Sequence, residues 1–268
     1  MLKAILYYIL LIAEFIITIF IGGLVLGFFM TYYTQKHTIA DKATFMSDVS
    51  PIIITFSLLS MVIVWFTFYK AKFSKFTLGK VRPTIKWKAM LYTSLPMLGF
   101  TLAYYAAMSI LHIHFLPKEM TELGYLSFIP YAIVGSFFSA YVFYGAIQEE
   151  LIRCGKQQWV QLLTLILMML PASIMSVSEE GNISWEHLGV LGILSTCYGF
   201  WIYGKTRSTI ILFAVYFLSN LVPAEIDSMP LPFVISLFVV GLALTVGGGI
   251  VLHKNLPIMI EKDENNPY

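Results

Sequence analysis

Eight apolar stretches follow one another along this chain, and each is close to the length of a helix that crosses a membrane. They lie at about residues 4–30, 51–69, 89–111, 126–147, 159–178, 188–204, 208–222 and 232–252. A helix needs ~20 mostly apolar residues to cross ~30 Å of hydrocarbon. Of all residues, 58% are hydrophobic and 12% are charged, whereas soluble chains carry roughly 25% charged residues. The pattern therefore predicts an all-α fold, a polytopic bundle of about eight transmembrane helices, and excludes soluble, disordered and single-span proteins.

The loops between these stretches differ in charge, and this difference predicts the orientation. The loop after the second stretch has no acidic residue and carries Lys70, Lys72, Lys75, Lys80, Arg82, Lys86 and Lys88. Short loops rich in Lys and Arg stay in the cytoplasm. This rule places both termini inside, together with every Lys and Arg except Lys36, Lys42 and Lys118. We expect the loop to be a solvated topology determinant; the alternative is a patch that binds anionic lipid or an acidic partner.

The same reasoning sets the domain organisation and the class of partner. Residues 1–252 are predicted to form a single transmembrane helical domain, and residues 253–268 a polar cytoplasmic tail. The lipid bilayer is the first partner that such a chain requires. The net charge of +2 gives no support to nucleic-acid binding.

Charged groups inside an apolar helix are functional candidates because burying them in hydrocarbon is costly. Glu14 stands alone in the first stretch, whereas Glu149, Glu150 and Arg153 gather at the end of the fourth. On a helix, Glu149 and Arg153 are four residues apart and share a face, so an ion pair is expected. Glu150 then lies on an adjacent face, where a carboxylate can activate water directly or through a metal. The alternative is a charged turn that simply ends a transmembrane helix.

Two further polar clusters follow. Residues 178–182, which include Glu179, close the fifth stretch, and Tyr216 and Asn220 lie one helical turn apart in the seventh. Tyr and Asn in a short apolar helix also serve as hydrogen-bonding contacts between helices.

Taken in order, these clusters resemble the CPBP family of intramembrane proteins, which includes CAAX-type proteases, bacteriocin-processing and immunity proteins, and abortive-infection (Abi) proteins. Its members carry a glutamate pair followed by arginine, an FxxxH helix end, and an HxxxN/D helix preceded by a Tyr-x-Arg/Lys-Thr-Gly-Ser hairpin. Here residues 175–182 (MSVSEEGN), 203–208 (YGKTRS) and 216–220 (YFLSN) stand at the last three positions. The resemblance covers roughly the second half of the chain. It implies a bacterial inner membrane, with Glu149, Glu150, Arg153, Glu179, Tyr216 and Asn220 at the catalytic positions.

The departures from the family pattern bear on activity. Glu179 and Tyr216 stand where the two histidines are expected, and aligning Arg153 with the family arginine puts Gln148 and Glu149 on the glutamate pair. A tyrosine with its usual pKa near ~10 is a poor base at neutral pH, and a site without imidazole loses much of its preference for zinc. The family fold can therefore persist without hydrolysis. A cofactor would be absent, or would be a divalent metal if the protein is active.

Three functions follow from these observations. The first is a proteolytically impaired CPBP-like protein that acts as a regulator or scaffold for a membrane-protein partner or a hydrophobic or lipidated peptide. The second is an active CAAX-type intramembrane endopeptidase, with Glu149 or Glu150 as the base and Asn220 stabilising the oxyanion. The third is a small transporter, which would require internal repeats that the chain does not show.

A shared site makes one demand on the fold. Glu149 is expected near the cytoplasmic end of its helix and Glu179 at the outer end of the next, some ~30 Å away at 1.5 Å per residue. For the clusters to meet, the chain around residues 148–163 must form a tilted or broken helix, which membranes tolerate only where protein or a wet cavity surrounds it. Gly155 permits such a break.

Overall fold

The computed structural model describes residues 78–111, 135–175, 185–222 and 229–260, together with Ala13, Ala132, Ile133 and Ile226; of residues 169–175 and 185–190 it describes the backbone. The chain divides into two compact units, Met1–Phe73 with Pro117–Phe138, and Ser74–Leu116 with Ser139–Tyr268. The single domain over residues 1–252 stays a prediction. Apolar composition is shared by both units, so hydropathy alone marks no boundary between them.

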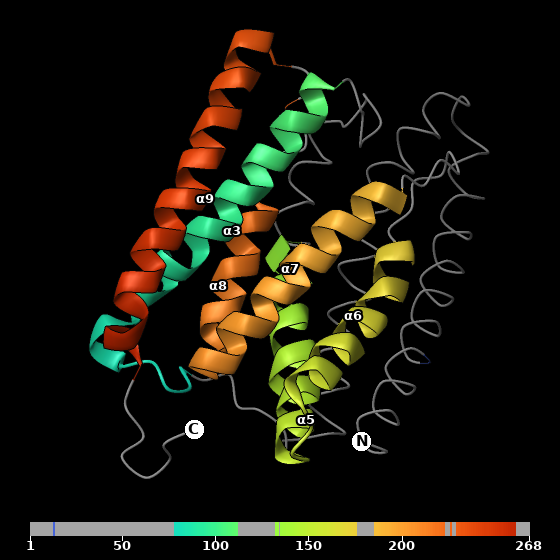
Figure 1. Cartoon of the computed structure of the whole chain (residues 1–268), viewed down its shortest axis with the longest axis vertical. Coiled ribbons are helices and arrows are strands. Elements are labelled where there is room, and N and C mark those ends of the chain that lie inside the picture. The colour runs from blue at the N-terminus through green and yellow to red at the C-terminus, as the bar shows by residue number, and fades with distance from the viewer. Residues whose placement is uncertain are drawn as a thin grey trace, which may run out of the picture. The chain divides into compact units, whose positions relative to one another are not determined.

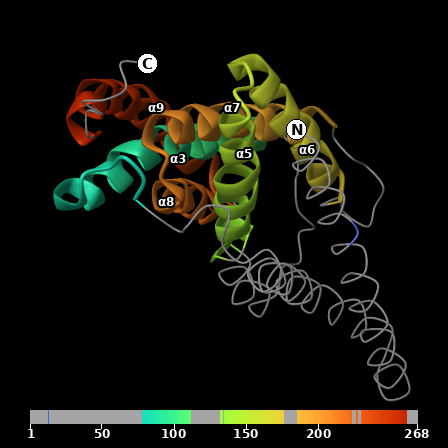
Figure 2. The ribbon, with the colours of Figure 1, turned by 90° about the horizontal axis from the view of Figure 1, so that it is seen from below.

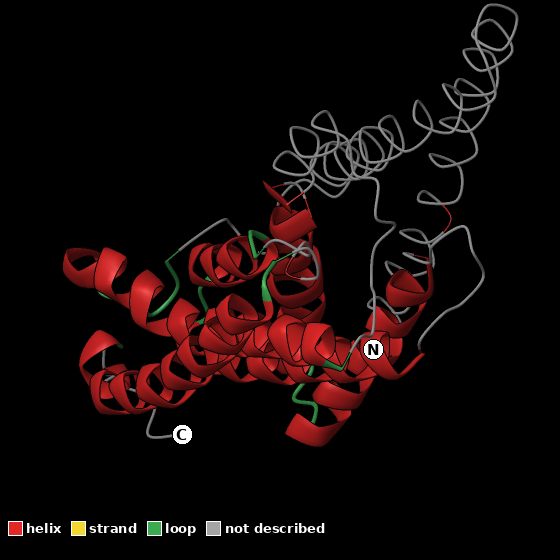
Figure 3. Ribbon diagram, turned by 90° about the horizontal axis from the view of Figure 1, so that it is seen from above, coloured by secondary structure: helices red, strands yellow, loops and turns green. Residues whose placement is uncertain are grey.

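The described residues form helices joined by loops (Figure 3). An isolated antiparallel bridge pairs Val81 with Ile260. The elements are η1 Pro83–Ile85, α3 Lys86–Ile110, the π-helix η2 Ser139–Gln148, α5 Glu149–Arg153, α6 Gln158–Met175, α7 Trp185–Thr206, α8 Thr209–Asn220 and α9 Leu231–Met259. This confirms the all-α class for the part of the chain described. The stretches predicted at 4–30 and 51–69 lie outside the described residues, apart from Ala13.

Among the described helices, α9 alone is long and apolar enough to cross a membrane by length and composition. The apolar helices Gln158–Met168 and Thr209–Asn220 are shorter. The prediction of about eight transmembrane helices therefore remains a prediction, supported so far by one helix of the required length.

Helices α3 and α9 lie side by side in both views (Figures 1 and 2) and are antiparallel, because the chain before α3 bonds to the end of α9. Glycines set their separation. A Cβ added to Gly241 would lie 2.5 Å from the amide nitrogen of Ala103, and one added to Gly99 would lie 2.5 Å from that of Thr245. The two backbones thus approach more closely than any larger residue allows, as is common where small residues line helix contacts in membranes.

Helix α9 extends beyond residue 252, where the apolar stretch ends in the sequence. The tail was expected from residue 253, but the helix continues to Met259, which is buried, and Ile260 pairs with Val81. The physical reason is that Leu252 and Met259 are seven residues apart and share the buried face of α9. Hydropathy falls at His253 and Lys254, although the packed face does not end there.

Two tight turns position the remaining helices. Gly155, in the turn between α5 and α6, has a φ of +65. This left-handed conformation favours glycine. The chain therefore turns at Gly155, between α5 and α6. Between α7 and α8, Arg207 has φ 51, and the Ser208 side chain caps α8 by accepting a hydrogen bond from the Ile211 amide at 3.2 Å. This is the tight hairpin predicted around residues 205–207.

Candidate functional site

The centre of the second unit contains two buried tyrosines from different helices. Tyr144 on η2 and Tyr216 on α8 bring their hydroxyls to 2.5 Å, and their rings stack with centroids 5.8 Å apart. The Tyr216 hydroxyl also donates to the Ser195 carbonyl of α7 at 3.0 Å. A Cβ on Gly199 would lie 2.5 Å from the Tyr144 hydroxyl and would also collide with that of Tyr216. The pair therefore fits because α7 carries a glycine at its point of contact.

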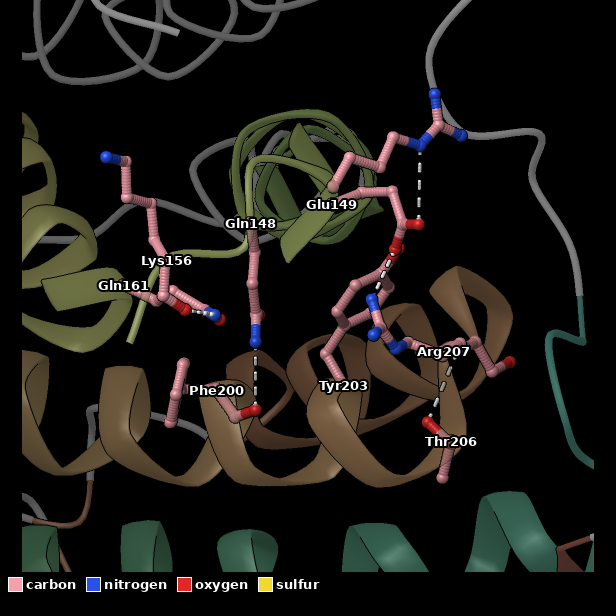
Figure 4. Close-up of polar contacts among 10 residues, drawn as sticks. Gln148, Glu149, Lys156, Gln161, Phe200, Tyr203, Thr206 and Arg207 are labelled. Atoms are coloured by element: carbon pink, nitrogen blue, oxygen red, sulfur yellow. Dashed lines mark hydrogen bonds and ion pairs between the residues drawn. The ribbon is translucent and has the colours of Figure 1, made fainter. Parts of the chain in front are cut away.

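Gln148 occupies the last position of η2 and is fully buried. Its amide nitrogen donates to the Phe200 carbonyl at 3.3 Å, which fixes the orientation of the amide (Figure 4). The other end, Oε1, is buried and has no hydrogen-bond partner within the described part of the chain. Long π-helices are rare and π-helical turns often mark functional sites, and here one delivers a buried amide to the backbone of α7.

Glu149 begins α5 and is held by three side chains (Figure 4). Its Oε2 accepts a hydrogen bond from Arg207 Nη1 at 2.7 Å and another from the Tyr203 hydroxyl at 3.2 Å, and Arg153 Nε lies 3.6 Å from Oε1. The expected pairing with Arg153 is thus confirmed, but the shorter bond goes to Arg207 in the α7–α8 turn. Two guanidinium groups and a phenol thus surround a single carboxylate.

The tyrosine pair and the ion pairs belong to one continuous strip. The ring of Tyr203 lies with its centroid 6.3 Å from that of Tyr144, while its hydroxyl reaches Glu149. We call the set Tyr144, Tyr203, Tyr216, Glu149 and Arg207 the polar strip. It connects η2 and α5 on one side to α7 and α8 on the other.

The other predicted site residues are placed as follows. Glu150 lies outside the polar strip, with the Cys154 thiol 3.8 Å from its Oε1. Asn220 ends α8, about 16 Å along the helix axis from its first residue at 1.5 Å per residue, and Glu149 lies at that first end. Glu179, like Glu14, lies outside the described residues. The structure therefore brings Glu149, Arg153 and Tyr216 into one region and separates Asn220 from Glu149.

Sequence reasoning did not single out Tyr144, Tyr203 or Arg207 as site residues. Tyr203 and Arg207 belong to the segment 203–208 quoted for its resemblance to the family hairpin, so that segment was the available signal. Tyr144 carried no signal of its own, because it lies in an apolar stretch and meets Tyr216 only through the three-dimensional fold.

The polar strip joins helices to one another through hydrogen bonds and an ion pair between their side chains. Among the described side chains, no three His, Cys, Asp or Glu residues gather closely enough to hold a metal ion. Comparison of the chain with protein-family models, with curated proteins and with solved structures finds no match.

Proposed function

We propose that this chain is a polytopic protein of the bacterial inner membrane, with about eight helices, cytoplasmic termini and a CPBP-like arrangement. In this proposal it has lost peptidase activity and acts as a regulator or scaffold. Its partner is a membrane protein or a hydrophobic or lipidated peptide. The membrane placement rests on the apolar stretches of the sequence and on the charge of its loops.

The outer face of α9 supports the membrane placement. Large apolar side chains are exposed along the whole helix, among them Phe233, Val239, Val246, Ile250 and Ile258. A continuous apolar helix face is the surface that lipid chains cover, whereas soluble proteins seldom expose patches of this kind. The glycine-mediated contact of α9 with α3 is also typical of helix pairs in membranes.

The observation that supports a loss of peptidase activity is the set of hydrogen bonds made by Tyr216. It stands where the family resemblance expects a histidine, and its hydroxyl is engaged by both Tyr144 and the Ser195 carbonyl. A phenol held in this way cannot replace an imidazole as a base or ligand. Glu149 is likewise engaged by Arg207, Arg153 and Tyr203, so both of its carboxylate oxygens already have partners.

The test is to incubate the purified full-length protein with peptide libraries, with and without added divalent metal. We expect no cleavage and a stable membrane-protein or peptide partner retained through purification. Cleavage that Glu149→Ala and Glu149→Gln both abolish, and that Glu150→Ala leaves intact, would establish the endopeptidase alternative instead. Solute flux into vesicles containing the protein would contradict the proposed scaffold function and would favour the transporter alternative.

A further inference from the structure

The charged side chains that the structure describes in the second unit are distributed very unevenly. The cations whose side chains the structure describes are Lys80, Arg82, Lys86, Lys88, Arg153, Lys156, Lys205, Arg207 and Lys254, and the described acidic side chains are Glu149 and Glu150. All of these residues lie at the end of the unit formed by the start of α3, the α5–α6 turn, the α7–α8 turn and the last turns of α9 (Figure 1). We call this end the basic end.

The basic end is assembled by backbone contacts between segments that are far apart in sequence. The Lys80 amide donates to the Thr206 carbonyl at 2.7 Å, and the Arg82 amide donates to the Met259 carbonyl at 3.1 Å. Val81 between them is 2% exposed and pairs with Ile260. This part of the basic loop is therefore packed against the helix ends, which differs from the solvated loop expected from the sequence.

This assembly goes beyond what membrane topology requires. The positive-inside rule needs Lys and Arg only in short cytoplasmic loops, whereas here the segment before α3 is hydrogen-bonded through its backbone to the α7–α8 turn and to the end of α9. Glu149 is already shared by Arg153 and Arg207. Arg82, Lys205 and Lys254 are exposed on the surface, where an anion can lie against them.

Exposed tryptophans at the same end identify the kind of anion. Trp87, in the first turn of α3, is 72% exposed, and the Lys86 ammonium lies 5.7 Å from its ring centroid. Trp159, in the first turn of α6, is 64% exposed. Tryptophans prefer the headgroup level of a bilayer, so the cations of the basic end lie at the depth of lipid phosphates.

We propose that the basic end binds the headgroups of anionic phospholipids, with Arg82, Lys205 and Lys254 as the exposed cations that contact them. This inference rests on the proposed membrane placement and not on the proposed loss of activity. Each cation near an anionic membrane surface strengthens binding by roughly fivefold, and salt weakens the effect.

The test uses the full-length protein reconstituted in vesicles of brominated phosphatidylcholine, in which the lipid around the protein quenches tryptophan fluorescence. Adding unbrominated phosphatidylglycerol should relieve quenching more than adding unbrominated phosphatidylcholine does. The preference should fall at least tenfold in the triple variant Arg82→Gln/Lys205→Gln/Lys254→Gln. The matched control Lys36→Gln/Lys42→Gln/Lys118→Gln removes the same charge from the predicted opposite side and should keep the preference.

Several outcomes would overturn the inference. One is an equal lipid preference in the triple variant and the wild type, and another is a loss of that preference in the control variant. A third is that inorganic phosphate abolishes the lipid preference of the wild type more than chloride does at the same ionic strength. The charge-preserving variant Arg82→Lys/Lys205→Arg/Lys254→Arg should bind as the wild type does, which separates loss of charge from loss of fold. Failure to insert into either kind of vesicle would defeat the proposed membrane function, whereas insertion without lipid preference would defeat only this inference.

Discussion

Two of the helix contacts in the second unit are built on opposite principles. Between α3 and α9, glycines bring two backbones together, and Gly99, Gly241 and Gly248 leave no room for a side chain. Between η2, α7 and α8, large polar side chains fill the contact and are satisfied by one another. The first contact depends on shape and the second on hydrogen bonds, so the two should respond differently to substitution.

The largest effect is expected at the α3–α9 contact. Gly241→Ala would place a methyl group 2.5 Å from the Ala103 amide nitrogen, and helix backbone cannot move aside as a side chain can. Overpacking of this kind costs about 2 kcal/mol of the free energy of unfolding. The measurement is thermal or denaturant unfolding of the purified protein in detergent.

The same helix supplies the control. A Cβ on Gly247 meets nothing within 4 Å, so Gly247→Ala should raise stability by up to about 1 kcal/mol through the better helix propensity of alanine. Equal effects of the two substitutions would mean that α3 and α9 do not pack through these glycines.

The next largest effect is expected in the polar strip. Tyr216→Phe and Tyr144→Phe each remove one hydroxyl from the buried pair, and each should destabilise the protein by about 1 kcal/mol. Because the hydroxyls bond to each other, the double variant should lose less than the sum of the single variants. Tyr92→Phe on α3 is the control, because the Tyr92 hydroxyl has no hydrogen bond in the described part of the chain. Strict additivity in the cycle would show that the two hydroxyls do not interact.

The contrast between the two contacts also separates what the sequence reveals from what it hides. The positions of α3, α6, α7 and α8 follow from apolar stretches bounded by charged, glycine or proline residues. The bond between Glu149 and Arg153 follows from their spacing of four residues. The glycine contact between α3 and α9 does not follow from the sequence, because no pattern in one helix indicates which face meets another.

The polar strip was hidden for a different reason. Tyr144 and Tyr216 are 72 residues apart, and Arg207 is 58 residues from Glu149. Their meeting depends on the rotation of three helices and on the wider turns of a π-helix, neither of which hydropathy encodes. The resemblance to a family pattern singled out Glu149 and Tyr216 as catalytic positions. The hydrogen bonds and ion pairs of these two side chains do not favour catalytic roles.

A smaller effect should distinguish the two arginines that share Glu149. The Arg207 side chain is 27% exposed, and its Nη1 lies 2.7 Å from Glu149 Oε2. The Arg153 side chain is 53% exposed, and its Nε lies 3.6 Å from Glu149 Oε1. Water screens the more exposed pair more strongly, so Arg207→Ala should cost about 1 kcal/mol and Arg153→Ala about 0.3 kcal/mol. Unfolding at low and high salt checks the assignment. If Arg153→Ala were the more damaging, Arg153 and not the α7–α8 turn would be the main partner of Glu149.

The smallest effect is expected at Gln148, where two terms oppose each other. Gln148→Met removes the hydrogen bond from Nε2 to the Phe200 carbonyl, and the loss of such a bond costs about 1 kcal/mol. The same substitution also removes Oε1, which is buried without a partner in the described part of the chain, and an unsatisfied acceptor carries a penalty of similar size.

The two terms should therefore nearly cancel, leaving a change in the free energy of unfolding within about 0.5 kcal/mol. Gln161→Met is the matched control, since Gln161 is also buried and its amide donates to the Lys156 carbonyl at 2.6 Å at the start of α6. That substitution should cost about 1 kcal/mol. A loss at Gln148 as large as that at Gln161 would reveal a donor to Oε1, such as a buried water, and would make the end of η2 a hydrated part of the polar strip.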